Sequence, residues 1–287
     1  ILHLPPDRID FPPRKPTLLG TYLSHCGINT FVFDINLHLR KKIKQKYQGF
    51  WQPANEHYWH DKERLLNFIT DNEKLIDGFV QKVSGKKPKI LVVDLVFPVE
   101  LFGAELITRI KQRQPAIQIV ASGFSCITQE QQEILQSHCR NNISFFHSSK
   151  SFSTLPQFLF SLLKKNKIKL TDNQYRGLNS FLSCQPEKLD QIQPDYTLIE
   201  HNLYRGRCFS VAFGTGSNFR CNFCFKHLND EGQKFRTPKV IFNEISSLKK
   251  KYNAKNIYLC GAPINGKSKV IEEVCDYLIQ EKLSLSW

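Results

Sequence analysis

The sequence contains no methionine, no apolar run long enough to cross a bilayer and no basic-then-apolar leader at its start. Even its longest apolar runs, such as residues 90–93, are far too short to span a bilayer, so we expect a cytoplasmic protein without a membrane span. Nine cysteines in 287 residues are too few for a disulfide scaffold, and their odd number favours reduced thiols. With 14 glycines, 14 prolines and 41% hydrophobic residues, collagen-like, coiled-coil and wholly disordered chains are excluded.

The chain is strongly basic, with 40 Lys and Arg against 26 Asp and Glu and a net charge of +14. Such a charge permits binding to nucleic acid or other anions. The basic residues lie in short runs at 40–46, 164–169 and 249–251. Each run falls at the end of a predicted helix, where cations favour the helix dipole and stay solvated. The charge therefore permits a nucleic-acid partner but does not favour one.

The first half of the chain alternates predicted strands and helices. Strands are expected at 1–4, 30–34, 89–94, 116–121 and 143–147, and helices at 17–25, 37–47, 61–83, 100–114, 129–138 and 155–165. Parallel strands need crossover connections, and helices supply them here. The fold class predicted for residues 1–165 is therefore α/β, with a doubly wound, Rossmann-like parallel sheet.

The pattern changes at residues 166–206, which are polar, contain Pro186 and Pro194 and show no periodicity. We interpret this segment as a linker or strap. Alternation resumes in residues 207–287, with strands expected at 208–213, 256–260 and 283–287 and helices at 237–252 and 268–281. Three strands cannot close a barrel, so we expect this part to be the beginning of a longer barrel domain.

The sharpest local feature is a pair of cysteines, Cys221 and Cys224, in the stretch that begins at Gly214. Two thiols three positions apart in a tight loop can bind one metal centre. The pair suits zinc, an iron–sulfur cluster or a dithiol couple. It follows a predicted strand and precedes a predicted helix, which is where α/β folds place ligands.

Several segments follow one another in a distinctive order and spacing: Leu4-Pro5-Pro6, Thr17 to Leu23, Val32 to Leu37, Ile192 to Tyr196, Arg236 to Tyr252 and Cys275 to Trp287. Through these segments the chain resembles, over nearly its full length, the cobalamin-binding radical S-adenosylmethionine (SAM) enzymes. It implies a cobalamin-binding α/β domain followed by a partial radical SAM (β/α) barrel.

The resemblance also implies a chemistry. Three cysteines spaced C-x3-C-x2-C would hold a 4Fe-4S cluster whose open position binds SAM. One electron then cleaves SAM to a 5′-deoxyadenosyl radical that abstracts hydrogen, and methylcobalamin commonly donates a methyl group. The implied function is methyl transfer or another C–H functionalisation. The substrate is an unidentified small molecule or peptide, and the electron donor a protein such as flavodoxin or ferredoxin.

The same resemblance assigns residues to the cofactors and leaves the catalytic side chains unassigned. Cys221 and Cys224 are metal ligands, and Phe223 between them lies against the adenine of SAM. Backbone near Gly261 approaches the amino end of SAM. Backbone that faces cobalamin is expected at six further positions: Val96, Phe97, Ser122, Gly123, Ser148 and Ser149.

Ser217 stands four residues before Cys221, where the family has its first cluster cysteine. Serine is a poor iron ligand, because its hydroxyl pKa lies far above that of a thiol and its oxygen is harder. Two alternatives to an active enzyme follow. The chain is a non-catalytic homologue that binds cobalamin, another tetrapyrrole or a protein partner. Otherwise, as the least favoured reading, it is a basic nucleic-acid module in which Cys208 and Cys260 join the pair around zinc.

Overall fold

The computed structural model of the chain describes residues 1–7, 9–95, 98–147, 154–165, 192–204, 206–217, 233–262 and 266–286. The chain divides into two compact units. The first comprises Ile1–Ile9 and Thr30–Leu159, and the second Asp10–Asn29 and Phe160–Trp287. Helix α1 (Arg14–His25) therefore belongs to the second unit. The division at residues 165 and 206 into a cobalamin-binding domain, a linker and a barrel remains a prediction.

The first unit is built on a five-stranded sheet in the order β2-β1-β3-β4-β5, with every neighbouring pair parallel. Its strands are β1 (Leu2–His3), β2 (Phe33–Asp34), β3 (Ile90–Asp94), β4 (Gln118–Ser122) and β5 (Phe145–His147). The order reverses at β1, because β2 and β3 lie on opposite sides of it. The predicted Rossmann-like α/β sheet is thus confirmed, with the carboxyl ends of all five strands at one edge.

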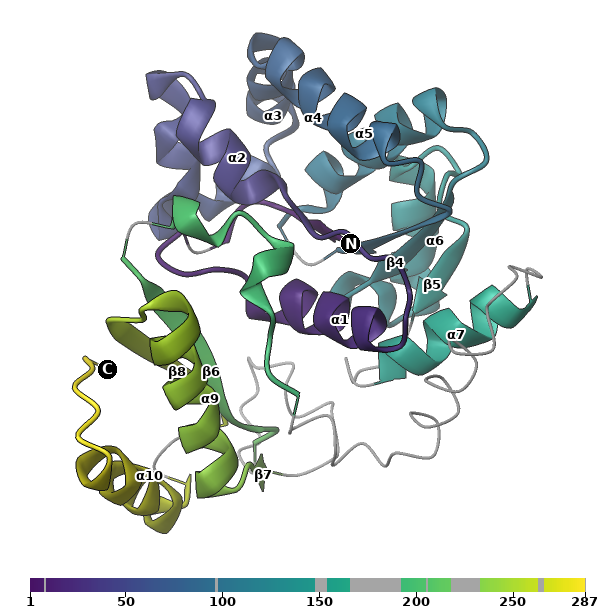
Figure 1. Cartoon of the computed structure of the whole chain (residues 1–287). Helices are drawn as coiled ribbons and strands as arrows, with labels where there is room; N and C mark the ends of the chain where they lie inside the picture. The colour runs from purple at the N-terminus through teal and green to yellow at the C-terminus, as the bar shows by residue number, and fades with distance from the viewer. Residues whose placement is uncertain are drawn as a thin grey trace. The chain divides into compact units, whose positions relative to one another are not determined.

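The connections of this sheet are helical (Figure 1). They comprise α2 (Ile35–Lys42), the 3-10 helices η1 (Gln45–Trp51), η2 (Pro53–Trp59) and η3 (Phe124–Cys126), and helices α3 (Lys62–Asp71), α4 (Glu73–Gly85), α5 (Glu100–Arg113) and α6 (Gln129–His138). Helix α7 (Leu155–Lys165) follows the last strand and includes the boundary between the two units at Leu159 and Phe160. Asp61 caps α3 by accepting from the Arg64 amide at 3.1 Å. The single helix predicted at 61–83 is wrong in one respect. Asn72 leaves the helical region at φ −117°, and its side chain donates to the Phe68 carbonyl at 2.8 Å.

The core of the first unit joins the sheet to an aromatic cluster. Alternate strand residues such as Val93 and Ile119 are fully buried. The ring of Phe68 on α3 lies 4.9 Å from that of Phe50, and the Trp59 indole donates to the Phe50 carbonyl at 2.8 Å. The region after α2 thus folds into the 3-10 helices η1 and η2. Their aromatic side chains bury a large apolar area, and the buried indole N–H of Trp59 has a hydrogen-bond acceptor.

The second unit contains a three-stranded sheet in the order β7-β6-β8. Strands β6 (Cys208–Thr215) and β8 (Asn256–Gly261) are parallel, and β7 (Lys234–Phe235) is antiparallel to β6. Helices α9 (Pro238–Tyr252) and α10 (Ser268–Gln280) accompany them (Figure 1), together with the 3-10 helices η6 (Tyr196–Leu198) and η7 (His201–Leu203). The strand predicted at 283–287 reduces to a parallel bridge from Ser286 to Asn256.

The two faces of the β6–β8 ladder differ in character. Phe209, Val211 and Phe213 are buried on one face, and the ring of Phe209 lies 5.6 Å from Tyr252 of α9. Ser210 and its neighbour in register, Tyr258, lie on the other face. Among the described helices of both units, none has the length and apolar character needed to cross a membrane.

Candidate functional site

The predicted site residues are divided between the two units, and seven of them lie outside the described residues. Those seven are Cys221, Phe223, Cys224, Val96, Phe97, Ser148 and Ser149. The four that the structure describes are Ser217 and Gly261 in the second unit and Ser122 and Gly123 in the first. Each of the four lies at or just beyond the carboxyl end of a parallel strand.

Ser217 lies two residues beyond the end of β6 and is half-buried. Gly216, immediately before it, has a φ of +73°, a conformation that L side chains rarely adopt. The chain therefore turns out of the strand at Gly216. Ser217 begins the connection from β6 at the edge where α/β sheets bind ligands.

A close approach of two glycines shapes this edge. Gly261 has a φ of +95°, and a Cβ there would lie 2.1 Å from the Gly214 carbonyl oxygen. A Cβ on Gly214 would lie 2.3 Å from the Lys234 carbonyl oxygen, and the Ala262 amide donates to the Gly214 carbonyl at 3.0 Å. Both glycines are thus required by the chain's own backbone. The expected approach of SAM to Gly261 remains a prediction.

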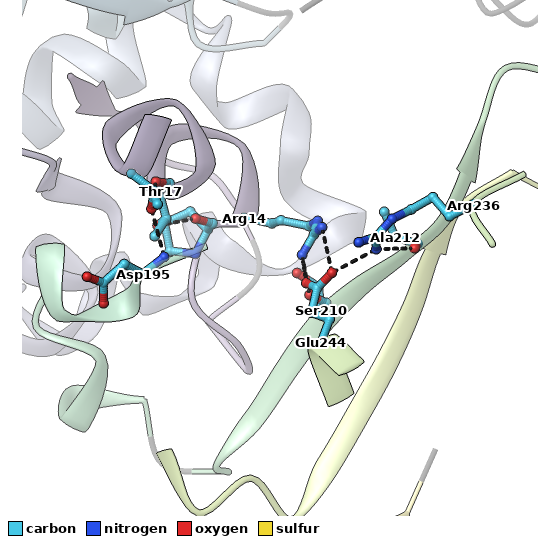
Figure 2. Close-up of polar contacts among 9 residues, drawn as sticks. Arg14, Thr17, Asp195, Ser210, Ala212, Arg236 and Glu244 are labelled. Carbon is cyan, nitrogen blue, oxygen red and sulfur yellow. Dashed lines mark hydrogen bonds and ion pairs between the residues drawn. The ribbon is translucent and has the colours of Figure 1, made fainter. Parts of the chain in front are cut away.

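The edge of β6 away from β8 is covered by two arginines. Strand β7 pairs only with Gly214 and Thr215. Farther back along β6, Arg14 Nη1 donates to the Ser210 carbonyl at 3.2 Å, and Arg236 Nη1 donates to the Ala212 carbonyl at 2.8 Å (Figure 2). The two arginine side chains thus donate to carbonyls of β6 that β7 is too short to reach.

Both guanidinium groups also bind one carboxylate, Glu244 of α9 (Figure 2). Arg14 makes two hydrogen bonds to it, the one from Nη2 to Oε2 being 3.2 Å long, and Arg236 Nη1 lies 2.7 Å from Oε2. The Glu244 side chain is 0% exposed and that of Arg236 2%. Burial alone would lower the pKa of Arg14, but the charge and hydrogen bond of Glu244 outweigh burial and raise this pKa. We call Arg14, Arg236 and Glu244 the β6 clamp.

Helix α1 is held in the second unit by another contact besides Arg14. The Asp195 amide donates to Thr21 Oγ1 at 2.7 Å, and the Asp195 carboxylate accepts from the Tyr252 hydroxyl at 2.9 Å. Burial and the Asp195 carboxylate together raise the pKa of Tyr252 to about 12, so its hydroxyl stays a donor at neutral pH. Helix α1 is therefore tied to α9 in two places, through Arg14 and Glu244 and through Thr21, Asp195 and Tyr252.

In the first unit, each of the five parallel strands ends in a polar residue. In sheet order these are Asp34, His3, Asp94, Ser122 and His147. The strand register places His3 opposite Asp34, and Ser122 opposite both Asp94 and His147. We call this set the polar row. Sequence reasoning missed it, although the signal was available. Four of the five apolar runs stop at a polar residue, at Asp34, Asp94, Ser122 and His147, and parallel alignment places such residues side by side.

One end of the polar row is a buried hydrogen-bonded histidine. His147 Nδ1 lies 3.3 Å from Ser122 Oγ, and Nε2 lies 3.0 Å from Thr154 Oγ1. The His147 residue is 3% exposed, and burial lowers its pKa. The Ser122 carbonyl accepts from the Leu95 amide at 2.6 Å. Both polar groups of Ser122 named here are thus bonded within the first unit.

The other end of the row is charged. His3 Nε2 lies 3.2 Å from Asp7 Oδ2. Burial alone would lower the pKa of His3, but the hydrogen bond to Asp7 and the charges of Asp34, Asp7 and Asp94 raise it overall. Beyond the row, Gly123 has a φ of +113°, and a Cβ there would meet the Leu95 carbonyl oxygen at 2.3 Å.

The register of β6 and β8 bears on the zinc alternative. Cys208 pairs with Asn256, and Ala212 with Cys260, so the two cysteines are four positions apart along the ladder. At about 3.3 Å per residue this is roughly 13 Å, too far for both to reach one zinc ion with Zn–S bonds of about 2.3 Å. Within the described ranges, no group of three or more His, Cys, Asp or Glu could hold a metal ion. The arrangement that adds both Cys208 and Cys260 is therefore wrong.

The chain is similar to the anaerobic magnesium-protoporphyrin IX monomethyl ester cyclase of Rubrivivax gelatinosus, with 28% identity over 106 residues. The match covers 35% of this chain and 19% of the cyclase, so the similarity spans only a small part of that protein's length. No family model matches the chain, and no solved structure matches it.

Proposed function

We propose that the chain is a cobalamin-binding protein of the radical SAM type. One observation carries the proposal. A Rossmann-like parallel sheet precedes a second parallel pair, β6 and β8, and Ser217, Cys221 and Cys224 lie between β6 and α9. This order agrees with the family resemblance of the sequence. The similarity to an anaerobic cyclase supports the resemblance at the level of the family.

The donor set fits a three-thiolate iron–sulfur cluster at two of its three positions. Cys221 and Cys224 provide thiols at the required spacing, while Ser217 offers a hydroxyl. When bound, a 4Fe-4S cluster supplies the electron that cleaves SAM. A site with two thiolates and one hydroxyl does not fit such a cluster well. We expect the natural chain to hold iron weakly and a third thiolate at position 217 to restore the set.

The polar row contains the side chains of the first unit that we consider as contacts for cobalamin. Both ring nitrogens of His147 are engaged, one with Ser122 and one with Thr154. Low pKa and full hydrogen bonding make this imidazole a structural group, so we do not assign it to cobalt. Cobalamin would instead meet backbone at the ends of the strands, as the resemblance implies for Ser122 and Gly123.

The second candidate is a non-catalytic homologue that keeps corrinoid or tetrapyrrole binding. The hydroxyl of Ser217 at a ligand position favours this candidate, because the loss of one thiolate ligand weakens cluster binding while the fold is retained. Hydroxocobalamin binding by equilibrium dialysis, measured beside iron content, separates the two candidates. Corrinoid binding by a chain that cannot acquire a cluster even with cysteine at 217 would establish the second candidate.

Anaerobic reconstitution with iron and sulfide tests the primary proposal. The proteins are the natural chain, Ser217→Cys, and a Ser217→Cys, Cys221→Ala control. We expect about four irons per chain in Ser217→Cys, clearly fewer in the natural chain and a loss in the control. An iron content of Ser217→Cys no higher than that of the control would overturn the radical SAM proposal.

A further inference from the structure

We propose that a groove in the second unit binds an alkyl carboxylate, that is, a free fatty acid of medium chain length. The groove is bounded by α9, β8, α10 and the residues that follow α10, and all of its lining residues are described. Its volume is about 400 Å³, within the range of about 300–1,000 Å³ that is usual for small-molecule sites. The proposal goes beyond the proposed function and does not depend on it.

The walls of the groove are aliphatic. They are formed by six branched side chains, those of Ile245, Ile257, Leu278, Ile279, Leu283 and Leu285. None of the lining residues is aromatic, so a planar ring would find no stacking partner there, whereas a flexible alkyl chain can pack along such walls. Ile279 is 73% exposed, and a bound chain would remove part of this apolar surface from water. Burial raises the pKa of Cys275, so this lining thiol stays neutral at neutral pH.

The wall formed by the residues after α10 is fixed by backbone hydrogen bonds at both of its ends. At one end the Leu283 amide donates to the Leu278 carbonyl at 2.9 Å. At the other end the Ile257 amide of β8 donates to the Ser286 carbonyl at 2.8 Å. The groove is therefore in place before a ligand arrives, and binding has little ordering cost to overcome.

Two lysines give the groove a positive edge, and no acidic residue lines it. Lys282 is exposed and belongs to the lining. Lys249 of α9 donates through Nζ to the carbonyl of Ser284, another lining residue, at 3.2 Å. An ammonium group has three donors, so this bond leaves Lys249 able to bind a carboxylate as well. Two ammonium groups beside an aliphatic groove complement a ligand with an anionic head and one alkyl chain.

The first measurement is isothermal titration calorimetry of the full chain with sodium octanoate, decanoate and dodecanoate, each below its critical micelle concentration. We expect a single saturable site. The affinity should rise about fourfold for each added methylene group, because each methylene that enters the groove leaves water. Dodecanoate that does not bind saturably, or an affinity that is independent of chain length, would overturn the proposal.

The second measurement compares two lysine variants of α10 and its end. Lys282→Met removes the charge and keeps most of the apolar length of the side chain. We expect it to weaken dodecanoate binding about two- to fivefold, the effect of losing one exposed ion pair. Lys269→Met is the matched control, because Lys269 is exposed on α10 and does not line the groove. Equal affinities of the two variants would contradict recognition of the carboxylate at this groove.

The third measurement locates the ligand through the reactivity of Cys275 toward N-ethylmaleimide. Cys275 lines the groove and is half-buried, while Cys208 is also half-buried and is not part of the lining. At a free dodecanoate concentration of about four times the Kd, about one chain in five is unliganded, so alkylation of Cys275 should slow about fivefold. Alkylation of Cys208 should not change. Peptide mass spectrometry reads both rates, and an unchanged rate at Cys275 would place the ligand elsewhere and overturn the proposal.

Two other occupants of the groove predict different results. If a second copy of the chain covers it, analytical ultracentrifugation will show dimers that Ile279→Lys abolishes. If an anionic membrane covers it, the chain will sediment with phosphatidylglycerol vesicles and Lys282→Met will weaken this association. Either result, obtained without saturable binding of free dodecanoate, would overturn the proposal in favour of that occupant.

Discussion

Arg14 and Glu244 form a buried, two-pronged ion pair across 230 residues of sequence. In the sequence, α1 lies between β1 and β2, which both belong to the first unit. The ion pair explains why α1 nevertheless belongs to the second unit. Arg236 completes the clamp at Glu244. The two units are therefore interleaved along the chain, and the second unit is complete only when Asp10–Asn29 are present.

Replacement of Glu244 by glutamine should strongly destabilise the protein. The carboxylate is fully buried between two arginines, and its removal leaves their charges uncompensated. Loss of one member of a buried ion pair costs about 3–5 kcal/mol, and we expect a decrease of that order in the free energy of unfolding. Urea denaturation measures it. Glu272→Gln on the exposed side of α10 is the control, and a similarly small effect of both changes would contradict the account.

Gly123→Ala should destabilise the first unit, because φ is +113° and the new Cβ would lie 2.3 Å from the Leu95 carbonyl oxygen. We expect the free energy of unfolding to decrease by about 1–3 kcal/mol. Gly78→Ala in α4 is the matched change. Nothing lies within 4 Å of its added Cβ, and we expect a gain of about 0.5–1 kcal/mol from helix propensity. Thermal melting of both variants provides the comparison, and a tolerated Gly123→Ala would refute the close packing inferred at the end of β4.

His147 should make the protein less stable in mild acid. Burial lowers its pKa below the ordinary value of 6.5, so the unfolded chain binds a proton more readily than the folded one. Its contribution is complete above pH 6.5 and is lost as the pH falls through 6.5 toward the lowered value. The stability difference between the natural chain and His147→Gln should therefore shrink from pH 8 to pH 5.5. A difference that grows on acidification would show that the imidazole is charged in the folded protein.

His3 should have the opposite dependence on pH. Its pKa is raised above 6.5, since Asp7, Asp34 and Asp94 together outweigh burial, so the folded chain holds its proton more tightly. Its contribution is complete below pH 6.5 and is lost as the pH rises through the raised value. The stability difference between the natural chain and His3→Gln should be larger at pH 6 than at pH 9. Equal differences at the two pH values would contradict the charged end of the polar row.

The sheet of the first unit could be predicted because its signals are local. The apolar run at 90–93 is typical of a buried parallel strand, and it forms β3 together with Asp94. The predicted helix at 129–138 matches α6, whose start is marked by a capping box between Thr128 and Gln131. Some predicted bounds were wrong. Helix α1 begins at Arg14 rather than Thr17, with Pro16 accommodated in its first turn. The helix predicted at 37–47 is α2, which ends at Lys42, and the 3-10 helix η1 begins at Gln45.

The β6 clamp could not be predicted, because its partners are separated by up to 230 residues and have no common local pattern. Strand β7 has only two residues, Lys234 and Phe235, which is too short for periodicity to reveal. The polar row could be predicted in part. Asp34, Asp94 and His147 end predicted strands, whereas His3 lies within the strand predicted at 1–4 and Ser122 follows the one predicted at 116–121. The sheet order was then needed to bring Asp94 beside Ser122.

Electron paramagnetic resonance of the reduced, reconstituted Ser217→Cys protein, recorded before and after addition of SAM, tests the central claim most directly. A cluster with one open iron position beside Cys221 and Cys224 predicts a cluster signal that changes shape when SAM binds, and a much weaker signal from the natural chain. A strong signal that SAM leaves unchanged, or full iron content without any SAM-dependent change, would contradict the assignment of this loop to radical SAM chemistry.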